Sequence, residues 1–540
     1  MAWTRYHASS THPPSIPARR RPKSGADDAP FPPWVLLDDR AYLAGESNHT
    51  TAVSRTRHGD QIQATFFLAD PPLVSYFAVS CAAELGCEPR VLYTEANLVL
   101  LVSVPGDPRN AIDPRKNDFY VYEVDDDAGA GGGPPKATLT LLPHPPPDLF
   151  PFPRDRCYYF HDCQVGLLRH RRNSDGGGGG GFYLRQHRPR AYDAYIVAAL
   201  CTRLTFPETL GLYTYVSDTE VWSSKPASFP DGGKLPRAAL RCDITIGGEA
   251  GTMAWVDLMR GIILCDVLPL DDDAKTLRYI PLPDPIRPDD TIDESGGMYR
   301  DVAVVGSRIK YAEVKMHVRP GSAGPKGSFT IDGWTAVVWS RPANSFKEST
   351  TWGKDHEVHA HQVSFVDGKN KTAPGFELLP AVVDHQGNPQ PTLVGIHVGH
   401  PKLSLSVGDN TLYLMAKVNR WYDKAWVIAV DMKNKRLRGV AEFGGAPRCS
   451  AFLHAYRQSR ISEHLNVSQG TKSHLKRPGM PLPHGSSHKK PEIPPHHVMH
   501  HCPSGQNPRA TWPTFPAQTI DDEDYDDDER TRMADDMDLE

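Results

Sequence analysis

The sequence predicts an all-β protein with a β-propeller-like body of about six to eight small antiparallel blades between disordered termini. Three observations support this prediction. Short apolar runs of strand length recur along the chain, separated by turn-forming residues. Proline (50) and glycine (44) are both abundant, as in loop-rich β proteins. No apolar run approaches the roughly 18 residues of a membrane-spanning helix.

Residues 251–283 show the repeating unit most clearly. The run 252–256 predicts a strand, and residues 257–260 are compatible with a turn. Gly261 follows this turn and gives the backbone the freedom to begin the next strand. A second strand follows over 262–267 and ends close to Asp266. After a polar loop, a third strand over 277–283 stops at prolines.

Similar units recur elsewhere, at intervals of about forty to sixty residues, which is typical of propellers. Each predicts a small antiparallel sheet, and the tryptophans inside them are expected to pack in the core rather than form a ligand cage. The units lie at 60–79, 96–147, 192–222, 306–342 and 407–443, and the tryptophans are Trp255, Trp334, Trp339 and Trp426.

The sequence predicts that the chain has three segments, a folded body between two disordered ends. Residues 1–30 are basic and proline-rich without apolar periodicity, which predicts disorder. Residues 31–465 form the body, and its last part, 449–465, is interpreted as a terminal helix with Phe452, Leu453 and Tyr456 facing inward. Residues 466–540 predict a disordered tail, rich in histidine and proline and then acidic. The last 20 residues carry a net charge of −10 and leave +5 on the rest.

The cysteines and the first residues indicate a compartment. Nine cysteines without a Cys-x-x-Cys pair, and no apolar signal sequence at the start, predict free and mostly buried thiols in a reducing environment. The expected location is cytoplasmic, nuclear or both. A basic cluster that fits a nuclear import signal consists of Arg19, Arg20, Arg21 and Lys23. The first 26 residues, rich in arginine and serine and without acidic residues, also resemble an organelle transit peptide, and a solvated tail is an equally good interpretation.

Metal-binding chemistry has one weak candidate in the body, the stretch DHEVHAHQ. His359 and His361 share a face of a strand, and His356 is close by in sequence. Such a group can bind zinc, but the spacing misses the His-Glu-x-x-His pattern, and surface histidines are the plainer interpretation. The run PPHHVMHHC at 494–502 is interpreted as compositional bias.

No nucleophile elbow, phosphate-binding loop or dinucleotide fingerprint is present in the sequence. The six glycines from Gly176 to Gly181 lack the Gly-Lys-Ser/Thr ending of a phosphate loop and are interpreted as a hairpin loop. The sequence therefore predicts a protein that is not an enzyme and has no cofactor. Its expected partners are proteins rather than nucleic acids or membranes.

Several sequence motifs, in their order and spacing, resemble those of the plant family called domain of unknown function 1618. They are WVLLDD (34–39), ADPPLVSYF (69–77), MAWVDLMRGIILCDVL (253–268), LRYIPLP (277–283) and DVAVVGSRIKYAEV (301–314). The resemblance implies a β-propeller-like body with a family core at about 253–400 and no established activity. The blades also resemble F-box-associated propellers, which recognise substrates for ubiquitin ligases.

Three functions follow from these patterns. The first is a non-catalytic protein-interaction module. The second is a substrate-recognition subunit of a ubiquitin ligase, whose F-box would come from a partner because residues 1–60 contain no leucine-periodic helices. The third is an enzyme with a site in the propeller channel. Fold alone does not separate them.

Overall fold

The structure is a computed structural model, in which the chain divides into two units, Met1–Lys472 and Ser473–Glu540. All residues that it describes lie in the first unit. They are 8–16, 31–107, 116–125, 136–146, 149, 164–170, 194–203, 206–230, 241–247, 250–268, 270, 272–286, 296–322, 324, 329–344, 350–383, 389–421, 424–444 and 454–465. The fold is all-β, as predicted, and α1 (Gly296–Tyr299) is a single helical turn.

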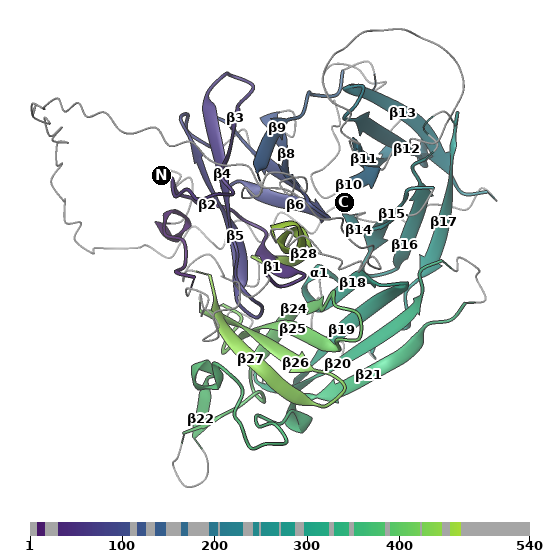
Figure 1. Cartoon of the computed structure of the whole chain (residues 1–540). Helices are drawn as coiled ribbons and strands as arrows, with labels where there is room; N and C mark the ends of the chain where they lie inside the picture. Colours follow the sequence, from purple (N-terminus) through teal and green to yellow (C-terminus); the bar gives the residue numbers. More distant parts are fainter. Residues whose placement is uncertain are drawn as a thin grey trace, which may run out of the picture. The chain divides into compact units, whose positions relative to one another are not determined.

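The described residues form a propeller-like body of five sheets (Figure 1). One of these sheets has eight strands, in two four-stranded halves that are joined where residues 227–228 pair in parallel with residues 275–276. Counting each half as one blade gives six, which we call blades 1 to 6. Blades 2 and 3 are four-stranded and antiparallel. Blade 2 contains β6 (Arg90–Glu95), β7 (Leu98–Ser103), β8 (Asp118–Val124) and β9 (Ala137–Leu141). Blade 3 contains β10 (Val165–His170), β11 (Ala194–Arg203), β12 (Phe206–Val216) and β13 (Val221–Ser228).

Blades 4 to 6 repeat this arrangement. Blade 4 contains β14 (Arg241–Gly247), β15 (Thr252–Asp257), β16 (Gly261–Asp266) and β17 (Lys275–Pro281). Blade 5 contains β18 (Arg300–Val305), β19 (Arg308–Val318), β20 (Ile331–Pro342) and β21 (Gly353–His359). Blade 6 contains β24 (His397–Leu403), β25 (Thr411–Lys417), β26 (Ala425–Asp431) and β27 (Arg436–Phe443).

Blade 1 differs because it combines strands from both ends of the described chain. Its order is β28 (Tyr456–Ser459), β1 (Val35–Asp38), β5 (Val74–Cys81), β4 (Gln61–Phe67) and β3 (Ala52–Arg55), with β2 (Tyr42–Leu43) also paired to β5. A separate hairpin, β22 (Ala381–Val383) with β23 (Pro389–Pro391), precedes blade 6.

One edge strand of each blade faces the axis of a closed ring: the first strand along the chain in blades 2 to 6, and β28 in blade 1. Strands β6, β10, β14, β18, β24 and β28 contact one another in this order, and β28 contacts β6 again (Figure 1). The blade number, six, lies at the lower end of the expected range. The ring is closed by β28, so the prediction of a terminal helix is wrong over the described residues 454–465. Tyr456–Ser459 form a strand and Ile461–Leu465 a 3₁₀-helix, whereas Phe452 and Leu453 lie outside the described residues.

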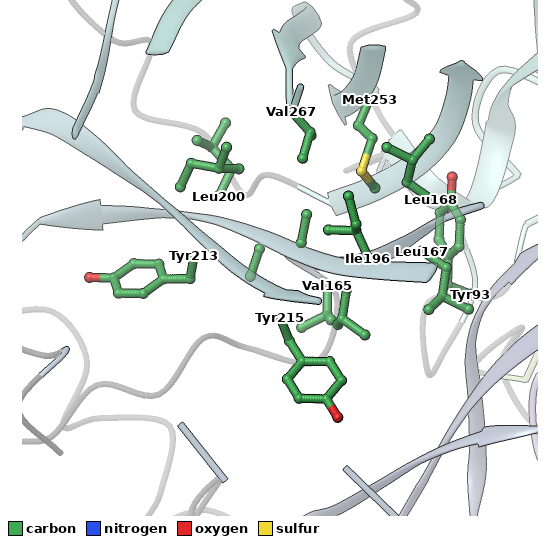
Figure 2. Close-up of a cluster of buried hydrophobic side chains, with 14 of the residues drawn as sticks. Tyr93, Val165, Leu167, Leu168, Ile196, Leu200, Tyr213, Tyr215, Met253 and Val267 are labelled. Atoms are coloured by element: carbon green, nitrogen blue, oxygen red, sulfur yellow. The ribbon is translucent and has the colours of Figure 1, made fainter. Parts of the chain in front are cut away.

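The cores lie between neighbouring blades, as face-to-face packing of sheets requires. Figure 2 shows the largest, where Tyr93 of blade 2, Leu167 and Ile196 of blade 3 and Met253 of blade 4 gather in one cluster. The predicted tryptophan packing is confirmed. Trp255 and Trp334 are 0% and 1% exposed, and Trp339 and Trp426 are also buried.

The repeating unit predicted at 251–283 forms blade 4. Strands β15 and β16 pair with each other, and Asp257 lies opposite Gly261. The turn between them therefore consists of residues 258–260. Asp257 caps this turn, since its Oδ1 accepts a hydrogen bond from the Met259 N–H at 2.9 Å. Among the described residues, no helix is long and apolar enough to span a membrane.

Candidate functional site

We call the pairing of β28 with β1 the seam. It brings polar side chains into the interior of the body. The two strands are antiparallel, with Asp38 opposite Tyr456. Strand β1 has the sequence VLLD and is buried along its whole length, so its closing aspartate is carried into the interior. His454 lies two residues before β28 and is fully buried.

Asp38, Asp39 and His454 form one cluster at the seam. The His454 Nε2 atom contacts Asp38 Oδ1 and lies 3.4 Å from Asp39 Oδ1, although the residues are about 416 positions apart. Backbone groups hold both carboxylates, because Arg40 N–H donates to Asp38 Oδ1 at 2.9 Å and Ala455 N–H to Asp39 Oδ1 at 3.4 Å. These contacts join the two strands that close the ring.

Burial governs the electrostatics of this cluster. It raises the pKa of Asp39, and although His454, Arg457 and Arg40 act in the opposite direction, the neighbouring Asp38 carboxylate adds to the increase. The ligand atoms of Asp38, Asp39 and His454 lie within 4.8 Å of one another, so within the described part of the chain these three residues have the geometry to hold a metal ion. Two carboxylate oxygens and one imidazole nitrogen suit zinc chemically. His454 already satisfies Asp38 without an ion.

A groove opens beside this cluster, and we call it the seam groove. The free space within it is small, about 30 Å³. Its walls come from blade 1, from the end of β27 in blade 6 and from residues 14–16, and the residues used below are Pro14, Asp38, Tyr42, Tyr76, Glu442 and Phe443. Phe443 joins the groove to the cluster, since its ring centroid lies 5.2 Å from that of His454.

The segment before the body takes part in this groove. Within residues 1–30, the structure describes 8–16, including a 3₁₀-helix over Ala8–Thr11. The Ser10 hydroxyl is buried and donates to the Glu88 carboxylate. The Tyr76 hydroxyl donates to the Pro14 carbonyl oxygen at 3.2 Å. This part of the segment therefore lies against the body.

A second polar cluster lies at the axis of the ring. Asp301 of β18 is buried and pairs with Lys402 Nζ at 2.7 Å, and it accepts a hydrogen bond from Gln458 Nε2 of β28 at 2.7 Å. Burial raises the pKa of Asp301, opposed mainly by Lys402. These contacts connect blades 5 and 6 to the closing strand.

Glu95, at the end of β6, is half-buried in the same central region. Burial raises its pKa to about 7, and the nearby guanidinium groups of Arg460 and Arg169 partly oppose the increase. Arg460 follows β28 directly and donates to the Leu405 carbonyl oxygen at 2.8 Å. A carboxyl group that titrates near neutral pH is thus placed next to the closing strand.

The histidines predicted as weak metal candidates lie on or just after β21. His359 and His361 stack with ring centroids 5.6 Å apart, while Thr335 Oγ1 lies 2.8 Å from His359 Nδ1. Glu357 is 3.5 Å from His359 Nε2. The grouping of ligand atoms found at the seam does not recur for His356, His359 and His361 in the described residues.

Other predicted positions have simpler outcomes. Arg19, Arg20, Arg21, Lys23 and the glycine run lie outside the described residues. Cys81, Cys87, Cys201 and Cys265 are not in disulfide bonds, as predicted, but of these four only Cys265 is buried. The sequence analysis did not predict the cluster of Asp38, Asp39 and His454, although both aspartates belong to the motif WVLLDD (34–39). His454 was hidden by the wrong expectation of a helix.

One family is similar to part of this chain. Residues 255–413 match the family described as "Protein of unknown function (DUF1618)". The predicted resemblance to the domain of unknown function 1618 is therefore confirmed over this segment, which runs from β15 to β25. Asp38, Asp39 and His454 lie outside it. No curated protein matches the chain.

Proposed function

We propose that the chain is a non-catalytic protein-interaction module whose binding surface includes the seam groove. One observation carries this proposal: a stretch of the chain's own polypeptide, residues 14–16, forms one wall of the groove, and Pro14 accepts a hydrogen bond from Tyr76 of the aromatic wall. Aromatic side chains are enriched at protein interfaces because they bury a large area at low entropic cost. A ring closed by paired strands provides a rigid support for such a surface.

The buried charges next to the groove support a structural rather than a catalytic role. His454 and Asp38 are 0% and 2% exposed and are tied to each other. A nucleophile or general base must reach the substrate to act. These two groups instead fix the position of the strands that form the groove.

Full-length protein with a photo-crosslinking amino acid in place of Glu442 tests the proposal. Glu442 is exposed at the rim of the groove. A matched protein carries the same amino acid in place of Val221, which is 57% exposed on blade 3. We expect a defined partner to crosslink from position 442 and not from position 221. No protein crosslinked from either position, in extracts of the native tissue, would contradict the proposal.

The crosslinked partner also separates the two binding roles. Subunits of a ubiquitin ligase would identify the chain as a substrate-recognition subunit, which is the role of the F-box-associated propellers that its blades resemble. A stable partner outside that machinery would support a general interaction module.

A catalytic channel is a second candidate because of Glu95. A carboxyl group with a pKa of about 7 near two guanidinium groups is suited to proton transfer at neutral pH. A broad hydrolase and transferase screen with the full chain, repeated with Glu95→Gln, tests this role. Turnover that disappears in a folded Glu95→Gln protein would favour an enzyme over an interaction module.

A further inference from the structure

We propose that the seam groove is a docking site for proline-rich segments of partner proteins, and that residues 13–16 of this chain cover it in cis. This inference rests on the proposed function and names the class of partner for the same surface. It is carried by the way in which the chain's own Pro-Pro segment is held.

The covering segment is attached at two points. The Ser10 hydroxyl donates to Glu88, and the 3₁₀-helix Ala8–Thr11 contacts β2 of blade 1. Further along, Tyr76 donates a hydrogen bond to the carbonyl oxygen of Pro14 at 3.2 Å. Residues 14–16 then form one wall of the groove. The segment is therefore anchored by Ser10 and laid across the groove by Tyr76.

The opposite wall has the character of proline-recognition surfaces. Tyr42 and Tyr76 line the groove, and their rings meet edge to face at 5.0 Å. Phe67 is not a lining residue, but its ring stacks on that of Tyr76 at 5.0 Å and supports it. Phe443 completes the wall from blade 6. Aromatic grooves of this kind bind proline-rich chains because a polyproline helix presents its rings and carbonyl oxygens at little entropic cost.

Proline also explains the polar contact. Prolyl residues lack an N–H group, so a groove that reads them must donate to their carbonyl oxygens. Burial, with a contribution from Glu46, raises the pKa of Tyr76 to about 12, so its hydroxyl keeps its proton and donates at neutral pH. His12 and Pro13 each precede a proline and are restricted to extended backbone, which preorganises the segment.

Coverage in cis has a consequence for binding. A tethered segment competes at an effective concentration of roughly millimolar. A partner peptide must displace it, so loosening the anchor at Ser10 strengthens binding in trans. Ser10→Ala removes the hydrogen bond to Glu88 and leaves every residue of the aromatic wall in place.

The experiment measures fluorescence anisotropy of a labelled peptide with the sequence of residues 8–18, ASSTHPPSIPA, against the full chain. We expect Ser10→Ala to bind the peptide about three- to tenfold more tightly than the wild type, as loss of one hydrogen bond in the covering segment implies. Adding Tyr76→Phe should weaken binding again by about three- to tenfold, because only the hydroxyl is lost. Tyr279→Phe, at a half-exposed tyrosine of blade 4, should change nothing.

Three results would overturn the inference: no binding to Ser10→Ala at millimolar peptide, equal binding of a scrambled peptide, or equal effects of Tyr76→Phe and Tyr279→Phe. Tighter binding of a peptide with residues 478–495 than of any other proline-rich peptide would assign the groove to the chain's own tail and would also overturn it. Crosslinking of a partner from position 442 that survives Tyr76→Phe would retain the interaction module and reject proline recognition. Absence of any crosslinked partner would reject the module itself.

Discussion

Blade 4 and blade 1 are sheets of the same ring that are stabilised in different ways. The strands of blade 4 follow one another along 41 residues, Arg241 to Pro281, and two of them are joined by a turn of three residues. Blade 1 combines residues 35–81 with residues 456–459. Apolar packing dominates the first, whereas a buried charge cluster closes the second.

The difference follows from chain entropy. Local hairpins close short loops at small entropic cost, whereas pairing β1 with β28 closes nearly the whole ring. The short strand β28 supplies little apolar area of its own, with Tyr456 as its large buried side chain. Buried charges select one partner and one register, since an unpaired charge in the interior costs several kcal/mol. The seam is thus specified by polar chemistry, and blade 4 by packing.

Trp255→Ala is the strongest test of the packing side. Trp255 is fully buried on β15 and its Nε1–H donates to the Gln164 carbonyl oxygen of the neighbouring blade at 2.9 Å. We expect a loss of about 3–5 kcal/mol in the free energy of unfolding, measured by chemical denaturation. Trp255→Phe should lose less. An unchanged melting temperature would show that blade 4 does not depend on packing at this position.

His454→Gln tests the charge side. Glutamine keeps a donor for Asp38 but removes the imidazole ring that contacts both Asp38 and Asp39, so we expect a loss of about 1–3 kcal/mol. Hydrogen exchange should accelerate first in β28 and β1, while the amides of blade 4 stay protected. His361→Gln, at an exposed histidine, is the matched control. Equal acceleration in all blades would remove the distinction between seam and blade.

This contrast also explains what the sequence predicted. Blade 4 could be predicted from the sequence because the alternation of its strands, the turn after Asp257 and the strand end at Pro281 are all encoded by neighbouring residues. Its blade-like repeats gave the fold class for the same reason. The stretch 449–465 was misread because its apolar spacing also fits a helix, and only pairing with β1, over 416 positions away, makes it a strand. No local signal encodes that partner, so the seam cluster and its groove stayed hidden.

Glu95→Gln sharpens the comparison through pH. The folded pKa of about 7 lies above the ordinary value of 4.5, so between these values the folded state holds a proton that the unfolded state has lost. Stability therefore falls as pH rises from about 4.5 to about 7 and stays reduced above. Glu95→Gln should remove this fall and exceed the wild type by about 1–2 kcal/mol at pH 8, with no advantage at pH 4. Parallel pH profiles for both proteins would contradict the charge effect near the closing strand.

The smallest expected effects come from two aspartates within blade 4, and they show that its charges matter little. Asp257 caps the turn through the Met259 N–H, a role that asparagine fills equally well, so Asp257→Asn should be nearly silent. Asp266 does not cap a turn. Its Oδ1 accepts from Oγ1 of the buried Thr252 at 2.5 Å and from Arg278 at 2.6 Å, and the Asp266–Arg278 pair is about one-third exposed. Asp266→Asn should therefore cost about 0.2–1 kcal/mol, less in high salt.

Measuring both variants together with His454→Gln places the two regions on one scale. If blade 4 depends on packing, its aspartates must matter less than the seam histidine, although all three residues form hydrogen bonds or ion pairs. A loss above 2 kcal/mol for Asp266→Asn would make a half-exposed pair as important as a buried one and would end that explanation. Loss of an enzymatic activity in folded Asp257→Asn, Asp266→Asn protein would mean instead that these carboxylates are catalytic, and the interaction module would fail with them.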